Sequence, residues 1–202
     1  MIIPKKKVER PTPYQNRRDL SQEEIRAINH YKDLINPQYK WDIKVEPEKG
    51  LGIDCQIING ILRRKYSPDM LSRRDKNRLS RTVRYINSAI NKSVLSKNLP
   101  LIKGIKRFKG LNTYKVGTTI TEYAFGSYTT KPQTAKSYSG KNSKGEYIYF
   151  TVELKRGDKA LYVDADEEEW ILKTRCKFVV TSIEHGTIEG CKAIIYHLEP
   201  IT

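Results

Sequence analysis

The chain has 202 residues, of which 38% are hydrophobic, and its 38 Lys and Arg against 23 Asp and Glu give a formal net charge of +15. This length suffices for one domain with a substantial core, and no apolar run approaches the roughly 18 residues that a membrane-spanning helix needs. We therefore expect no membrane partner, and the positive charge favours an acidic or polyanionic one.

The N-terminal segment is basic and lacks the apolar core of a signal peptide. Three explanations stay open: the chain never used the general export route, it has been processed, or it relies on a dedicated secretion or injection system. In each case we expect it to act in the cytoplasm of its host or of a target cell. Residues 1–20 are polar and contain prolines, which predicts a mobile basic arm.

Helices are predicted to dominate the first half of the chain. Ser21, followed three residues later by Glu24, is typical of a capping box at a helix start. Apolar residues recur at helical spacing in two later segments, which predicts helices over about 53–65 and about 72–92. Residues 21–99 are thus expected to be mostly helical.

The second half alternates with a period of two, which is typical of strands. In residues 145–154 the apolar side chains fall on one face, namely those of Ile148, Phe150, Val152 and Leu154. Further strands are predicted at 160–163, 170–172, 178–183 and 192–198. Residues 130–138 are predicted to form a short helix with Thr130 as its N-cap.

Helices followed by a mostly antiparallel sheet indicate an α+β fold. We expect a single domain over residues 21–202, with a helical part at 21–99 and a β-rich part at 100–202. The three cysteines are too few and too scattered for a disulfide framework or a zinc site, so free thiols are the favoured interpretation. The three histidines also lack the spacing of metal ligands, and we expect no metal.

Three segments of the β-rich half carry the residues that suit chemistry. An apolar strand at 101–105 contains Lys103 followed by a glycine, and a strand ending near Thr129 contains Ser127. The acidic triplet 167–169 precedes the apolar run Trp170-Ile-Leu172. Carboxylates two positions apart in an extended segment face the same side, and such a pair suits a reaction that builds positive charge on a sugar carbon. For a lone triplet a solvated turn would be the favoured interpretation, so the other two segments are what favour a site.

In this order and spacing the three segments resemble those of the mono-ADP-ribosyltransferases of the bacterial exotoxin type, which have relatives among phage-encoded transferases. That family carries an arginine on its first catalytic strand, a Ser-Thr-Ser-like strand and a Glu-x-Glu or Gln-x-Glu turn. The resemblance also includes 58–63 and 86–95, so it covers roughly residues 20–202. It implies N-terminal helices packed on a two-sheet core, with a cleft that binds NAD as co-substrate.

The resemblance implies a role for each matching residue. Glu169 would stabilise the oxocarbenium-like ribose that forms when the bond to nicotinamide breaks. Glu167 would position or deprotonate the acceptor, and a glutamate there is the family pattern for arginine acceptors on proteins. Ser127 would hold the ribose and orient Glu169, with Thr129 in support. Gly104 would let backbone amides approach the nicotinamide carboxamide.

One departure concerns the phosphates of NAD. The family has an arginine where this chain has Lys103, and lysine lacks the planar fork that grips a phosphate through two hydrogen bonds. Lys103 could suffice as the anchor, Arg107 could reach the phosphates instead, or the chain could be a catalytically weakened module that binds NAD or a partner. The presence of Ser127, Glu167 and Glu169 favours retained activity.

A rival hypothesis concerns the acceptor. Basic residues are concentrated at 63–85 and 92–109, and a polyanion is a natural partner for such segments. ADP-ribosylation of a nucleic acid is therefore the alternative to ADP-ribosylation of a protein arginine. The segments carry no zinc knuckle and no aromatic RNA-binding signature, so a solvated basic face stays the simpler interpretation of the charge.

Overall fold

The computed structural model describes residues 15–17, 19–32, 41–43, 53–106 and 110–201. The helices are α1 (Gln22–Tyr31), α2 (Ile53–Leu62), α3 (Arg73–Asn91) and α4 (Pro132–Ser137), with short 3-10 turns at Pro68–Met70 and Leu111–Thr113. The strands are β1 (Gln15–Arg17), β2 (Ser93–Leu95), β3 (Leu99–Gly104), β4 (Thr119–Glu122), β5 (Gly126–Thr129), β6 (Tyr147–Leu154), β7 (Leu161–Asp164), β8 (Glu169–Leu172), β9 (Cys176–Ile188) and β10 (Cys191–Ile201).

The helix starts follow from local capping. Ser21 accepts a hydrogen bond from the backbone N–H of Glu24, whose carboxylate accepts one from the N–H of Ser21, so the capping box of α1 is confirmed. Ser72 caps α3 in the same way through the N–H of Asp75. The short helix α4 differs from its prediction, because its N-cap is Lys131 and not Thr130. The hydroxyl of Thr130 donates to Glu168 instead.

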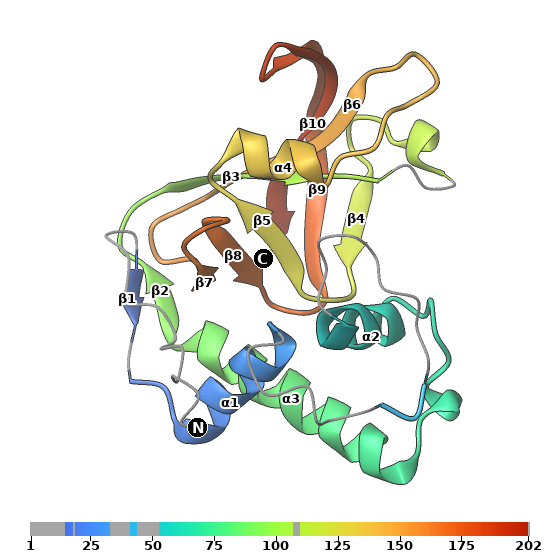
Figure 1. Ribbon diagram of the computed structural model, residues 1–202. Coiled ribbons are helices and arrows are strands. Elements are labelled where there is room, and N and C mark those ends of the chain that lie inside the picture. The colour runs from blue at the N-terminus through green and yellow to red at the C-terminus, as the bar shows by residue number, and fades with distance from the viewer. Residues whose placement is uncertain (1–14, 18, 33–40, 44–52, 107–109, 202) are drawn as a thin grey trace.

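One eight-stranded sheet forms the centre of the molecule, in the order β4-β9-β10-β6-β3-β5-β8-β7 (Figure 1). All neighbours run antiparallel except β10 and β6, which confirms a mostly antiparallel sheet. The expectation of two separate sheets is corrected to one, because β3 and β5 are hydrogen-bonded. That link is narrow: β3 and β5 pair at Ile102 and Thr129, whereas β3 pairs with β6 from Leu99 to Gly104.

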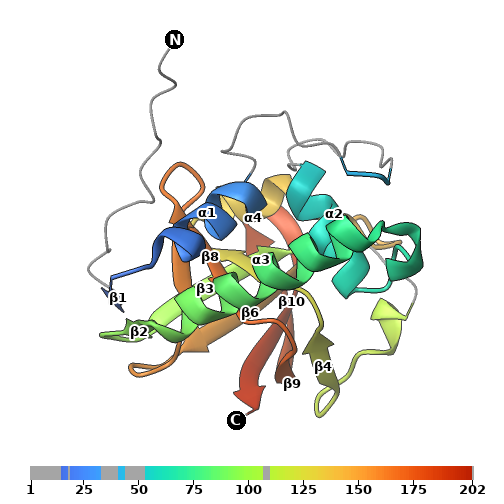
Figure 2. The ribbon, with the colours of Figure 1, turned by 90° about the horizontal axis from the view of Figure 1, so that it is seen from below.

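Helices cover one face of the sheet at two different places, because the register puts Gly104, which meets α4, on the same face as Ile171. Helices α1, α2 and α3 gather at one end of the sheet, and seen from below α3 crosses the molecule beside the other two (Figures 1 and 2). Their apolar faces form a core with Phe125, Leu161, Val163 and Ile171. Helix α4 lies across β3, and its Ala135 packs with residues of β6 and β10 in a separate cluster. The face of β8 that carries Ile171 is therefore the face that meets the three helices.

The N-terminal arm and strand β4 differ from what the sequence predicts. Three residues of the expected mobile arm form β1, which pairs antiparallel with β2, and residues 1–14 lie outside the described part. Strand β4 was not expected at all, although it supplies a residue of the site. The three cysteines are free, as expected. In the described ranges, no helix is long and apolar enough to cross a membrane.

Candidate active site

Strand pairing brings Ser127 and Glu169 together. In β8 side chains alternate, so Glu169 shares a face with Ile171, and Ser127 of β5 lies directly opposite Ile171. The Ser127 hydroxyl donates a hydrogen bond to Glu169 Oε1 at 2.6 Å. Glu169 is only 7% exposed, so its carboxylate depends on such partners. The expected contact between Ser127 and Glu169 is present across two neighbouring strands.

A cation that the sequence did not point to completes this cluster. Lys32, the C-cap of α1, places its Nζ 2.5 Å from Glu169 Oε2, 3.4 Å from Asp164 Oδ2 and 3.7 Å from Glu167 Oε2. Its side chain is 16% exposed. Burial alone would lower the pKa of Lys32, but the three carboxylates outweigh burial and raise that pKa above its usual value. The ammonium is therefore held in its charged form. We call Lys32 with its three carboxylates the acidic end.

Glu167 reaches the acidic end by a different route from the one expected. Residues 165–168 form a turn in which Glu168 has φ of +46°, so 167–169 is not an extended segment. Glu167 and Glu169 still both line the same cavity. The turn is held from β5 and the start of α4, because Thr129 Oγ1 donates to the Glu167 carbonyl at 2.6 Å and Lys131 Nζ donates to the Asp166 carbonyl.

Tyr138, at the end of α4, fixes the side chain of Glu167. Its hydroxyl donates a hydrogen bond to Glu167 Oε1 at 2.6 Å. Partial burial and the neighbouring carboxylates of Glu167 and Glu169 raise the pKa of the Tyr138 hydroxyl, so it stays a donor. Glu167 is thus held through one oxygen by a phenol and approached at the other by an ammonium.

A second charged group lies on the other side of the cavity and has the opposite sign. Glu122, the last residue of β4, forms ion pairs with Lys103 of β3 and with Arg63, which follows α2. The Arg63 guanidinium donates to Glu122 Oε1 through Nη2 at 2.9 Å and through Nε at 3.2 Å. Lys103 Nζ also lies 5.1 Å from the ring centre of Tyr128. We call Arg63, Lys103 and Glu122 the basic end.

Burial shapes the charges of the basic end. The side chain of Lys103 is 16% exposed, and burial together with the nearby Arg63 lowers its pKa in spite of Glu122. The pKa of Glu122 is held below its usual value, because the two cations outweigh the effect of burial. The side chain of Arg63 is 44% exposed, more than that of Lys103 or Glu122.

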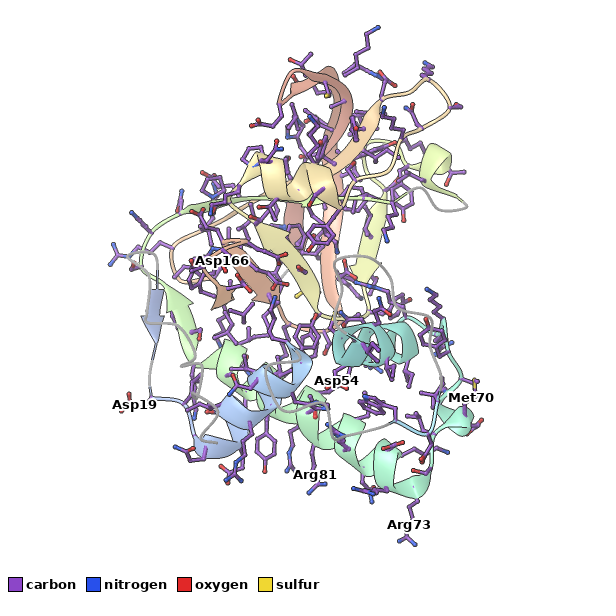
Figure 3. The ribbon with its side chains drawn as sticks, in the orientation of Figure 1. Asp19, Asp54, Met70, Arg73, Arg81 and Asp166 are labelled. Carbon is purple, nitrogen blue, oxygen red and sulfur yellow. The ribbon has the colours of Figure 1, made fainter. Side chains whose placement is uncertain are left out.

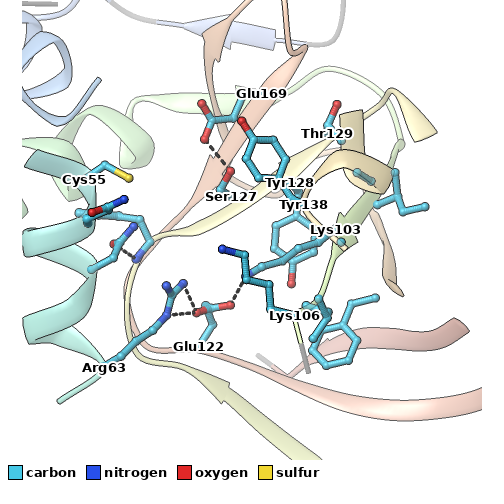
Figure 4. Close-up of a pocket in the computed structure, with 18 of the residues that line it drawn as sticks. Cys55, Arg63, Lys103, Lys106, Glu122, Ser127, Tyr128, Thr129, Tyr138 and Glu169 are labelled. Carbon is cyan, nitrogen blue, oxygen red and sulfur yellow. Dashed lines mark hydrogen bonds and ion pairs between the residues drawn. The ribbon is translucent and has the colours of Figure 1, made fainter. Parts of the chain in front are cut away.

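A single cavity of about 550 Å³ joins the two ends. Figure 4 shows Glu169 and Ser127 on one side and Arg63, Glu122 and Lys103 on the other. The volume is within the usual range of small-molecule sites, roughly 300–1,000 Å³. Within the described part of the chain, no group of His, Cys, Asp and Glu has the arrangement of a metal site.

Gly104 and Thr129, both named from the sequence, also lie at the cavity. A Cβ on Gly104 would lie 2.0 Å from the carbonyl oxygen of Ala135, so α4 can cross β3 only at a glycine. Its contact with nicotinamide stays a prediction. Arg107 lies outside the described residues. Trp170, which follows the acidic triplet, is 1% exposed and belongs to the hydrophobic core.

Comparison with known proteins places this geometry in a structural class. The sequence matches no protein-family model and no curated protein. The structure resembles the enzymatic component C2-I of the Clostridium botulinum C2 toxin, with a TM-score of 0.63 and 19% identity over 90% of this chain and 44% of C2-I. It also resembles the ADP-ribosyltransferase Vis, solved with agmatine, with a TM-score of 0.58 and 20% identity over 91% of this chain and 77% of Vis.

A third similar structure is C3stau2 from Staphylococcus aureus, solved with NAD, with a TM-score of 0.58 and 17% identity over 90% of this chain and 88% of that one. The fold is that of the bacterial ADP-ribosyltransferase toxins. This chain spans less than half the length of C2-I, so the likeness covers one part of that protein.

Proposed function

We propose that this protein is an NAD-dependent mono-ADP-ribosyltransferase that transfers ADP-ribose to an arginine of a protein. The observation that carries the proposal is the hydrogen bond of 2.6 Å between Ser127 and the buried carboxylate of Glu169, inside a cavity on this fold. The fold alone does not imply an activity, so the proposal depends on the residues of this site.

The charges of the cavity match the parts of NAD. The pyrophosphate is an anion, and the basic end offers two cations to it, of which Arg63 has the guanidinium fork that Lys103 lacks. Phosphate oxygens would take the place of the Glu122 carboxylate on these cations. Arg63 thus supplies the guanidinium that is missing at position 103. The proposal of an active enzyme therefore does not depend on Arg107.

At the other end, Glu169 and Ser127 suit the nicotinamide ribose. The bond between the ribose C1 carbon and the nicotinamide nitrogen breaks, and both electrons leave with neutral nicotinamide. The ribose then carries positive charge, which the fixed carboxylate of Glu169 stabilises without reorganisation. Ser127 holds Glu169 in place. The low exposure of Glu169 strengthens the electrostatic effect, because water screens it less.

Glu167 suits the acceptor step. An arginine nitrogen attacks the ribose carbon with its lone pair, and the guanidinium gives up a proton to Glu167. The Tyr138 hydroxyl and the pinned turn hold Glu167 at the cavity wall, where it lines the same space as Glu169. In the absence of an acceptor, water attacks instead and NAD is hydrolysed slowly.

Incubation of the protein with NAD labelled on its adenylate part and a cell lysate tests the proposal. We expect released nicotinamide and label on protein, with both signals lost on Glu169→Gln. Loss of transfer with retained hydrolysis on Glu167→Gln would identify the acceptor role. Label that survives Glu169→Gln, or the absence of nicotinamide release by the unaltered protein, contradicts the proposal.

A nucleic-acid acceptor is the second candidate, because α3 exposes a row of cations. Arg73 and Arg81 project away from the body of the molecule (Figure 3), and Arg84 is exposed on the same helix. Label that is removed by nuclease and not by protease would favour this candidate. A steep fall of the labelling rate with salt would accompany it, because phosphate contacts release counterions.

A further inference from the structure

Three carboxylates converge on one ammonium at the acidic end. Lys32 Nζ lies 2.5 Å from Glu169, 3.4 Å from Asp164 and 3.7 Å from Glu167. Three negative charges and the one positive charge of Lys32 sum to −2, so the site favours positive charge. Asp164, at the end of β7, belongs to this group although the sequence did not single it out, and it accepts a hydrogen bond from the Glu167 N–H at 3.1 Å.

The position of Lys32 coincides with the place that the acceptor needs. A cationic acceptor must approach both Glu167, which takes its proton, and the ribose carbon held beside Glu169. Lys32 Nζ lies between these two carboxylates and contacts both. With its Nζ 2.5 Å from Glu169 and 3.7 Å from Glu167, Lys32 fills the space that a guanidinium would need to contact both oxygens. The lysine ammonium and an acceptor guanidinium therefore exclude each other.

We propose that Lys32 is a built-in substitute for the acceptor cation, seated in a subsite formed by Asp164, Glu167 and Glu169 that takes a guanidinium or alkylammonium group once Lys32 withdraws. The proposal rests on the proposed function and adds the occupant of its acceptor subsite. It also assigns Asp164 to substrate binding.

The local structure allows Lys32 to leave the subsite without unfolding α1. The backbone of Lys32 is anchored by its N–H, which donates to the Ile28 carbonyl, and by its neighbour Tyr31, which is 1% exposed. Tyr31 accepts a hydrogen bond from Asn59 Nδ2 at 2.8 Å and packs edge-on against Phe125. The four-carbon stem of Lys32 is flexible, so the ammonium can swing out while the backbone stays fixed.

Because an acceptor must displace Lys32, it needs a minimum affinity for the protein. A ligand that competes with an occupied site binds more weakly by the fraction of time the site is vacant. A free cation of low affinity is therefore excluded, whereas a protein that also docks elsewhere supplies the additional binding energy. With the subsite filled by Lys32, Glu167 and Glu169 share one ammonium and keep a net negative charge until an acceptor arrives.

Agmatine, which carries one guanidinium and one ammonium, is the probe for the test, and calorimetry without NAD is the readout. We expect Lys32→Met to bind agmatine at least about ten-fold more tightly than the unaltered protein, because the competing ammonium is gone. Lys32→Arg should bind no more tightly, and Asp164→Asn in the Lys32→Met background should lose the gain. Lys76→Met is the matched control, since Lys76 pairs with the exposed Asp69 at 3.3 Å.

A second readout uses the unaltered protein and does not depend on the folding of a variant. Reductive methylation followed by mass spectrometry reports the accessibility of each lysine amine. We expect the ratio of Lys32 to Lys76 methylation to be low for the protein alone and several-fold higher with agmatine at a concentration that saturates the calorimetric signal. The ratio cancels the reagent that the primary amine of agmatine consumes. Unchanged reactivity of Lys32 under saturating agmatine overturns the proposal, as does a folded Lys32→Met protein that binds agmatine no more tightly.

Nicotinamide release measured on the same samples separates this inference from the proposed function. Tighter agmatine binding by Lys32→Met without any nicotinamide release from NAD would support the subsite and contradict the proposed transferase activity. Nicotinamide release without any effect of Lys32 on agmatine binding would do the reverse.

Discussion

The two ends of the cavity are charge opposites built on the same plan. At the acidic end three carboxylates surround the ammonium of Lys32, and at the basic end Lys103 and Arg63 flank the carboxylate of Glu122. Each end thus contains one internal counter-ion of the sign that the substrate would bring. The difference lies in rigidity: Glu169 is 7% exposed and bonded within the sheet, whereas Arg63 is 44% exposed on its side chain.

This contrast suggests a division of labour. The acidic end holds its carboxylates in place before substrate arrives, as electrostatic stabilisation of a transition state requires. In the proposed mechanism the basic end would exchange one anion, Glu122, for another, the pyrophosphate, and the half-exposed side chain of Arg63 would adjust as it does so. Changes at the acidic end should therefore affect the rate of reaction, and changes at the basic end should affect the affinity for NAD.

The largest effect is expected at the acidic end. Glu169→Gln keeps the size of the side chain and removes its charge, so it should lower the rate of nicotinamide release by roughly 100- to 1,000-fold while the affinity for NAD changes little. Steady-state kinetics with calorimetry of NAD binding checks this split. A variant that loses NAD affinity and keeps its rate would reverse the roles of the two ends.

The basic end should show the opposite pattern. Lys103→Ala and Arg63→Ala should each weaken NAD binding by roughly 10- to 100-fold, as expected for the loss of a charged hydrogen bond, with a smaller change in turnover at saturation. Arg73→Ala, on the outer side of α3, is the control for a general loss of positive charge. If Arg73→Ala weakens NAD binding as much as Arg63→Ala, the specific role of Arg63 is wrong.

The contribution of Glu122 to the stability of the fold should depend on pH. The folded-state pKa of Glu122 is lowered, so its contribution to stability is present above the unfolded-state value near 4.5 and is lost as pH falls through the lower folded-state pKa. Glu122→Gln should cost about 1–3 kcal/mol of unfolding free energy near neutral pH, and this deficit should shrink in acid. Urea unfolding at several pH values measures it, and a deficit that grows in acid contradicts the assignment.

The smallest effect concerns the acceptor step alone. Tyr138→Phe removes the hydroxyl that holds Glu167, which corresponds to one hydrogen bond or roughly a five-fold lower transfer to agmatine. Hydrolysis of NAD should be unchanged, because water does not need Glu167 in a fixed position. Equal losses in transfer and hydrolysis would show that Tyr138 acts on the whole site and not on Glu167.

Much of the fold could be predicted from local signals. The capping box at Ser21 and the alternation in 145–154 each depend on neighbours in the chain, and both are confirmed. The contact between Ser127 and Glu169 was expected from the family resemblance. The exact N-cap of α4 was missed, because Thr130 finds a better partner in the Glu168 carboxylate, which lies 38 residues away.

The rest of the site depends on contacts that local patterns do not encode. Lys32 meets Glu169 across 137 residues, and Arg63 meets Glu122 across 59. Lys32 ends a helix and is of a residue type that is mostly exposed, and Arg63 belongs to a basic run that is typical of a solvated face. Glu122 lies on β4, a short strand whose polar sequence gave no strand signal. Only the three-dimensional arrangement shows that the cavity has two counter-ions of its own.

The structure of the Glu169→Gln protein with NAD bound tests the central claim most directly. We expect the nicotinamide ribose within hydrogen-bonding distance of Ser127, the pyrophosphate in contact with both Arg63 and Lys103, and Glu122 displaced from them. A pyrophosphate that contacts neither cation, or a ribose remote from Ser127 and residue 169, would contradict the account.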